Sequence, residues 1–142
     1  MKLAFSTLGC PGWSWDEIFA TAKDLGFSGI EVRGVAREMY APAIKIFDQA
    51  RAEATMQRLR QSGVEIPMLT SGACLGLPGE TQAPLQEAMD YIRLAARLGV
   101  GYVRVMITPL PQPGDADIDQ AKALYTKLCA AAKELGVSVL IE

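Results

Sequence analysis

The chain has 142 residues, half of them hydrophobic, and its 14 basic and 16 acidic side chains give a net charge of −2. This length suits a single domain with a sizeable core. The charge excludes the strongly basic surface with which proteins bind nucleic acid. No apolar run approaches the length of a membrane span, so we expect neither a nucleic-acid nor a membrane partner.

Two residue types limit the chemistry further. The chain contains no histidine, the commonest general base and the commonest transition-metal ligand. Its three cysteines are an odd number without the spacing of a metal or redox motif. They are typical of reduced thiols, and we expect a cytoplasmic protein.

The first half of the chain alternates between strand and helix patterns. Ser14 and Glu17 have the spacing of a capping box, which predicts that a helix begins there and ends at Gly26. Asp48 is a candidate N-cap for a second helix. Pro67 falls inside the third expected strand, where it removes a backbone donor. The predicted elements are strands at 2–8, 29–33 and 64–70 and helices at 14–26 and 49–61.

The second half continues the alternation. We expect a glycine-rich loop at 71–81, then a helix with Pro84 in its first turn. A loop at 108–114 contains three prolines, and Asp115 or Asp117 would cap the helix that follows it. The predicted elements are helices at 82–98 and 118–135 and strands at 102–107 and 137–141.

A glycine recurs where each predicted helix ends, at positions 26, 63, 99 and 136, a spacing of 36 or 37 residues. A period in this range indicates one supersecondary unit used repeatedly, here a helix, a glycine and a strand. Strands joined in this way are parallel, because each crossover returns the chain to the same edge of the sheet.

Alternation within the strands separates two faces. We expect one face, β-branched, to contact the helices, and the opposite face to carry charges. A doubly wound sheet covered by helices on both sides has no place for those charges, whereas a barrel interior does. The β-branched face holds Val32, Val103, Val105, Val139 and Ile141, and the charged face holds Glu31, Arg33, Arg104 and Glu142.

Three segments, at 2–8, 22–33 and 95–105, together resemble the xylose isomerase-like TIM-barrel family. Its members include sugar phosphate isomerases and epimerases, ketohexose 3-epimerases, inosose dehydratases and endonuclease IV. The resemblance implies an α/β fold of the (β/α)8 TIM-barrel class, of which this chain would form a half-barrel of five parallel strands and four helices. Eight units of this length would need roughly 290 residues. We therefore expect residues 1–142 to be the N-terminal half of one barrel domain.

The resemblance also implies a divalent metal, Mn²⁺, Mg²⁺ or Co²⁺, at the C-terminal mouth of the full-length barrel. Epimerase-type members bind it through a glutamate ending strand five and three side chains on later strands. Glu142 matches that glutamate. The alternative is an exposed terminal carboxylate. We expect no tight metal binding by this chain alone, because one carboxylate cannot complete a coordination shell.

Endonuclease IV also takes histidine ligands from the ends of strands three and four. Here those ends read Thr70-Ser71-Gly72 and Ile107-Thr108-Pro109. This departure argues against a role in DNA repair.

Five residues are candidates for substrate binding, each with a simpler alternative. Glu31 and Arg33 could contact substrate or form a barrel-lining ion pair, also with Arg104, whose deeper position favours a structural role. Cys74 matches a substrate-contacting cysteine of some epimerases, or is a loop thiol without a role. Trp13 could form the wall of a sugar pocket or pack around the helix cap at Ser14.

Two hypotheses of function follow. In the first, the chain is part of a metal-dependent sugar or polyol isomerase or epimerase that moves a proton next to a carbonyl, or of a dehydratase of the inosose type; alone it would be inactive. In the second, it is a non-catalytic half-barrel that self-associates or pairs with a separate C-terminal half through its two sheet edges.

Overall fold

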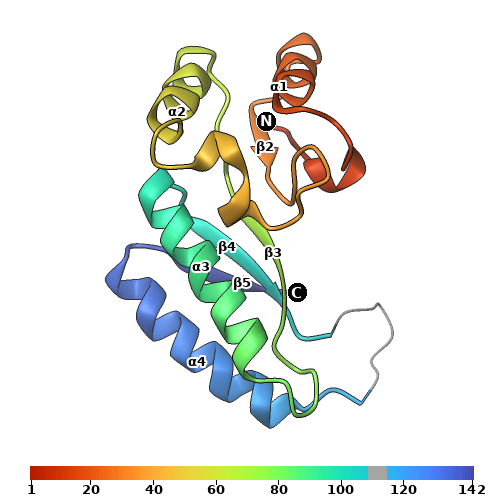
Figure 1. The fold of residues 1–142 in the computed structure, drawn as a ribbon, viewed down its shortest axis with the longest axis vertical. Helices are drawn as coiled ribbons and strands as arrows, with labels where there is room; N and C mark the ends of the chain where they lie inside the picture. Colours follow the sequence, from red (N-terminus) through yellow and green to blue (C-terminus); the bar gives the residue numbers. More distant parts are fainter. Residues whose placement is uncertain (109–114) are drawn as a thin grey trace.

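Strands and helices alternate along the whole chain in the computed structural model, which describes residues 1–108 and 115–142 (Figure 1). The expected half-barrel of five parallel strands and four α-helices is confirmed. Apart from Thr108, the predicted proline-rich loop lies outside the described residues. The elements are β1 (Ala4–Ser6), α1 (Trp15–Asp24), β2 (Gly29–Glu31), α2 (Ala52–Gln61), β3 (Leu69–Cys74), α3 (Gln82–Leu98), β4 (Tyr102–Met106), α4 (Ile118–Glu134) and β5 (Ser138–Ile141).

The strands follow one another in sequence order and are parallel. One ladder joins β1 to β2, and a second joins β3, β4 and β5. Two parallel bridges, Gly29 with Glu65 and Val32 with Leu69, connect the ladders. Sequential parallel neighbours with right-handed crossovers place all connecting helices on one face of the sheet.

Strand β3 begins five residues later than predicted and ends later. The stretch before it contacts β2 only through isolated bonds, such as Ile30 N to the Glu65 carbonyl (2.9 Å). Pro67 explains the interruption, because it cannot donate to a ladder. Cys74 is consequently the last residue of β3 and does not lie in the following loop.

Strand β1 and helix α2 are also shorter than predicted. A 3₁₀ turn, η1 (Thr7–Gly9), ends β1 early. Helix α2 begins after Arg51, and the Asp48 carboxylate instead accepts hydrogen bonds from the backbone N–H groups of Ala50 (3.0 Å) and Arg51 (2.9 Å). Asp48 therefore closes the turn before the helix and does not cap the helix itself.

The recurring glycines end the four helices in one way. Each has a positive φ, between 67° and 71°, a conformation that glycine adopts without a steric penalty. The residue after each glycine donates its N–H back to the last helical turn, as Val100 does to the Ala95 carbonyl (2.9 Å). This is the Schellman arrangement, and it releases the chain directly into the next strand.

The helices cover the β-branched face of the sheet. Helix α3 packs on β3 and β4, α4 packs on β5, and the two helices lie side by side (Figure 1). Val32, Val103, Val105 and Val139 are buried on this face, as predicted. Ile141, the last residue of β5, differs, with 44% exposure. Among the described residues, no helix is long and apolar enough to cross a membrane.

The capping box at Ser14 gives a test of the local structure. Its hydroxyl accepts the Glu17 N–H (3.4 Å), and the Glu17 carboxylate accepts the Ser14 N–H (2.7 Å). We expect Ser14→Ala to lower the free energy of unfolding by about 1 kcal/mol. Urea denaturation measures this, with Ser138→Ala on the exposed part of β5 as the control. Equal stability of the two variants would contradict the capping role.

Candidate functional site

A row of polar side chains crosses the face of the sheet that points away from the helices. On β2, the Glu31 carboxylate accepts hydrogen bonds from the hydroxyls of Ser6 on β1 (3.2 Å) and Thr70 on β3 (2.5 Å). Thr70 lies opposite Arg104 of β4 in the strand register. Neighbouring strands thus bring polar groups distant in sequence to one level of the inner face.

Arg104 and Glu142 lie at one end of this row. The polar row thus consists of Ser6, Glu31, Thr70, Arg104 and Glu142. The Arg104 Nε lies 2.8 Å from a carboxylate oxygen of Glu142. The Glu142 backbone continues the β5 ladder, since its N–H donates to Val105 (3.0 Å) and its carbonyl accepts from Ile107 (3.0 Å). That register places the Glu142 side chain on the face of Arg104, at the carboxyl edge of the sheet.

Arg33 does not join this row. Its backbone N–H and that of Gly34 donate to the Thr7 hydroxyl (2.9 and 3.0 Å), which turns the chain out of the strand. The guanidinium donates to the Met39 carbonyl (2.6 Å). The alternative of an ion pair between Glu31 and Arg33 is therefore wrong: hydroxyls satisfy Glu31, and Arg33 binds a backbone oxygen of the β2–α2 connection.

The structure adds Glu87, which the sequence analysis did not single out. Its carboxylate accepts the backbone N–H of Gly72 in β3 (2.6 Å). A Cβ atom at position 72 would lie 2.8 Å from an Arg33 nitrogen and 3.1 Å from the Glu87 carboxylate, so a larger residue there would displace the ends of these two side chains. One sequence signal exists: Glu87 lies four residues before the buried Tyr91, on a helix face that is otherwise apolar.

Cys74 lies at the carboxyl end of β3, opposite Met106 of β4, whereas Trp13 lies in the β1–α1 connection. Cys74 is only 4% exposed; burial raises the pKa of its thiol, against a lowering effect of Arg104. It is therefore a poor nucleophile at neutral pH. Trp13 is 41% exposed and lies over a hollow on α1 that Glu17, Ala20, Thr21 and Asp24 also line. Neither side chain is brought next to Glu31.

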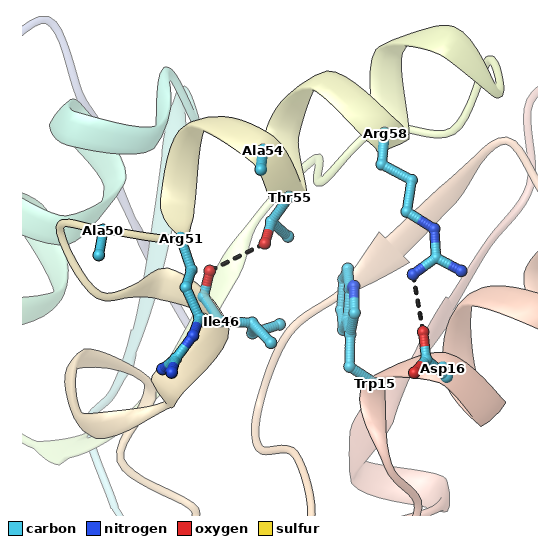
Figure 2. A pocket seen from close by; sticks show the side chains of 8 residues that line it. All are labelled: Trp15, Asp16, Ile46, Ala50, Arg51, Ala54, Thr55 and Arg58. Carbon is cyan, nitrogen blue, oxygen red and sulfur yellow. Dashed lines mark hydrogen bonds and ion pairs between the residues drawn. The ribbon is translucent and has the colours of Figure 1, made fainter.

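A groove of about 420 Å³ lies between α1 and α2, on the helix side of the fold (Figure 2). Its polar groups bond to one another. Arg58 pairs with Asp16 (2.7 Å) and stacks over Phe19 (4.2 Å), and the Thr55 hydroxyl donates to the Ile46 carbonyl (2.9 Å). Figure 2 shows the Arg58–Asp16 pair on one wall of the groove and Arg51 on the other. With these partners satisfied, the groove offers little for recognition, and the inner face remains the candidate site.

The polar groups fit a metal ion only in part. A glutamate oxygen is a suitable ligand for Mn²⁺ or Mg²⁺. Within residues 1–108 and 115–142, however, no three His, Cys, Asp or Glu side chains are grouped closely enough to hold an ion. Glu142 could therefore supply one ligand, and the described residues do not form a metal site by themselves.

Two tyrosines hold the segment Met39–Ala41 against α3. Tyr40 donates its hydroxyl to Asp90 (2.7 Å), while Tyr91 donates to the Met39 carbonyl (3.0 Å) and accepts from Ala41 N–H (2.9 Å). Burial, together with the hydrogen bond to Asp90, raises the pKa of Tyr40 to about 12. These contacts fix the β2–α2 connection above the carboxyl ends of β2 and β3.

The family model for the xylose isomerase-like TIM barrel matches residues 19–142, and the chain therefore belongs to this family. Comparison with curated proteins gives no match.

Solved structures share the fold. The IolI protein, solved with a bound zinc atom, has a TM-score of 0.74 at 17% identity, over 99% of this chain and 51% of that one. The probable 3-DHS dehydratase AsbF from Bacillus anthracis gives 0.70 at 21%, over 99% and 52%. An L-ribulose 3-epimerase gives 0.70 at 16%, over 99% and 49%. The chain spans about half the length of these structures.

The incomplete donor set predicts weak metal binding. We expect calorimetric titration of the 142-residue chain with Mn²⁺ to show no binding tighter than the high micromolar range, because a single carboxylate supplies too few ligands. Glu142→Gln serves as the control and should give the same weak heat. A stoichiometric submicromolar site that disappears in this variant would contradict the prediction.

The raised pKa of Tyr40 predicts a loss of stability at alkaline pH. Below the ordinary value of 10.0 the hydroxyl is protonated in both states and its contribution is complete. As the pH rises to about 12, the unfolded state ionises first and the contribution is lost. We expect Tyr40→Phe to flatten the decline of unfolding free energy over this interval, and Tyr102→Phe, at an exposed site, to change it less. Parallel slopes for wild type and Tyr40→Phe would refute this.

Proposed function

We propose that the chain is the N-terminal half of a barrel that isomerises or epimerises a sugar or polyol, with Glu142 as one ligand of a divalent metal. The observation that carries the proposal is the position of Glu142. Its side chain lies on the inner face at the carboxyl end of β5. TIM-barrel enzymes build their active sites at this end of the strands. Family membership supports the assignment, and the named epimerase among the similar structures agrees with it.

Isomerisation and epimerisation need a group that moves a proton on the carbon next to a carbonyl. A bound Mn²⁺, Mg²⁺ or Co²⁺ would polarise that carbonyl and a neighbouring hydroxyl. From this chain, Glu31 and Arg104 are the proposed substrate-facing groups, because both belong to the polar row. Arg33 has less support as a substrate contact, since its guanidinium donates to the Met39 carbonyl. Cys74 has less because it is buried, and Trp13 because it lies over a hollow on α1.

A dehydratase of the inosose type is the alternative reaction. Removing water next to a carbonyl begins with the same proton abstraction, so the same inner-face carboxylate would serve. One of the similar structures is a probable dehydratase. Product analysis separates the two, because a dehydratase product is lighter by one water.

The second candidate is a half-barrel module that assembles with another chain. It is favoured by apolar side chains at both sheet edges: Leu140 and Ile141 near the end of β5 are 41% and 44% exposed, and Leu3 before β1 is 52% exposed. Unpaired edges of this kind invite pairing with a second chain. The cytoplasmic location expected from the free cysteines suits both candidates.

The test begins with the gene. A reading frame that continues beyond Glu142 with further strand–helix repeats supports the enzyme, and a stop codon there supports the module. If the reading frame continues, the longer protein that it encodes (the continuing protein) is assayed for activity on ketohexoses and polyols in the presence of Mn²⁺. We expect Glu142→Gln to lower kcat/KM by more than about 100-fold, the upper range for an outer-shell partner of a metal ligand. Glu134→Gln, an exposed change at the end of α4, should leave activity unchanged. Full activity of the Glu142→Gln variant would contradict the proposal.

A further inference from the structure

Arg104 contacts both strands that flank its own. Its Nε pairs with the Glu142 carboxylate after β5 (2.8 Å), and its Nη1 donates to the Ser71 carbonyl of β3 (3.4 Å). The Arg104 side chain is only 16% exposed, whereas that of Glu142 is 70% exposed. A mostly buried cation with contacts on two sides thus lies against the end of a largely exposed glutamate side chain.

An irregularity of β3 makes this contact possible. Between Thr70, opposite Arg104, and Cys74, opposite Met106, β3 has more residues than β4, which is a β-bulge. The Ser71 hydroxyl donates to the Arg104 carbonyl (2.7 Å), and Glu87 on α3 accepts the Gly72 N–H (2.6 Å). These bonds hold the bulge on both sides, so the Ser71 carbonyl remains within reach of the guanidinium.

The contact restricts a side chain that otherwise has many rotamers. A glutamate loses rotamer entropy when it is fixed, and its partner must offset that cost. Pairs between exposed charges are worth little, but here one partner is only 16% exposed and has a second contact with the Ser71 carbonyl. An arginine can bind two acceptors with a rigid fork, which the single ammonium of lysine does not reproduce.

We propose that Arg104 is a positioning residue for Glu142: anchored on the bulge of β3, it holds the Glu142 carboxylate in one orientation on the inner face. As a statement about Glu142 as a metal ligand, this inference rests on the proposed function. The contact itself does not, and the two can be tested separately.

Side-chain NMR of the 142-residue chain tests the contact without any metal. Three-bond couplings report the χ1 rotamers of Glu142. We expect one dominant rotamer in the wild type, averaged couplings in Arg104→Gln and in Arg104→Lys, and unchanged couplings in Arg97→Gln, a matched change at an exposed position of α3. Unchanged Glu142 couplings in a folded Arg104→Gln variant would overturn the proposal.

A reciprocal variant covers the case in which loss of Arg104 prevents folding. In Glu142→Gln, we expect the Arg104 Nε–H to lose its protection from solvent exchange by at least about tenfold, because the charge-assisted bond is gone. Unaltered protection would overturn the proposal as well.

The Mn²⁺ affinity of the continuing protein then distinguishes the role of Glu142 as a metal ligand from the role of Arg104 in positioning it. We expect Arg104→Gln to weaken Mn²⁺ binding by about 10- to 100-fold, as loss of an outer-shell partner does. If Glu142→Gln leaves Mn²⁺ affinity unchanged while the NMR results hold, the proposed function fails and the contact stands. If Glu142→Gln abolishes binding but Arg104→Gln does not affect it, the positioning role fails and the proposed function stands.

Discussion

Each helix of this chain returns the next strand to the same end of the sheet, so the carboxyl ends of all five strands meet at one edge and the helices cover one face. The two faces of the sheet therefore differ in character. Valines at alternate positions are buried against α3 and α4, and the residues between them face the other way. Glu31, Arg104 and Glu142 reach the inner face through this alternation, whereas the contacts of Ser71 and Glu87 depend on the β-bulge in β3.

The inner face combines satisfied polar groups with uncovered apolar ones. Glu31 accepts two hydroxyls and Arg104 pairs with Glu142, so the charges have partners within the described residues. On the same face, Tyr102 is 49% and Leu140 41% exposed. Leaving roughly 200 Å² of apolar surface in water costs about 5 kcal/mol, as much as the whole stability of many small domains. Hydrogen bonds and an ion pair therefore hold the polar groups of this face, while apolar side chains beside them remain exposed.

Much of the fold follows from local signals in the sequence. Helix α3 has the predicted bounds because Pro84 suits a first turn and Gly99 adopts the left-handed conformation that ends the helix. The face assignment of Glu31, Arg104 and Glu142 needs only strand alternation. Strand alternation does not place Arg33, because its backbone N–H bonds to the Thr7 hydroxyl, 26 residues away, where the chain leaves the strand. The bulge in β3 and the role of Glu87 depend on contacts across the fold, which spacing alone does not reveal.

We infer that the inner face of this half-barrel needs a partner surface. Light scattering of the 142-residue chain over a wide concentration range, combined with thermal melting, tests it most directly. We expect either association that increases with concentration or a monomer that melts at the lower end of the mesophile range, about 45 °C. A strictly monomeric species at high concentration that melts above about 70 °C would contradict it.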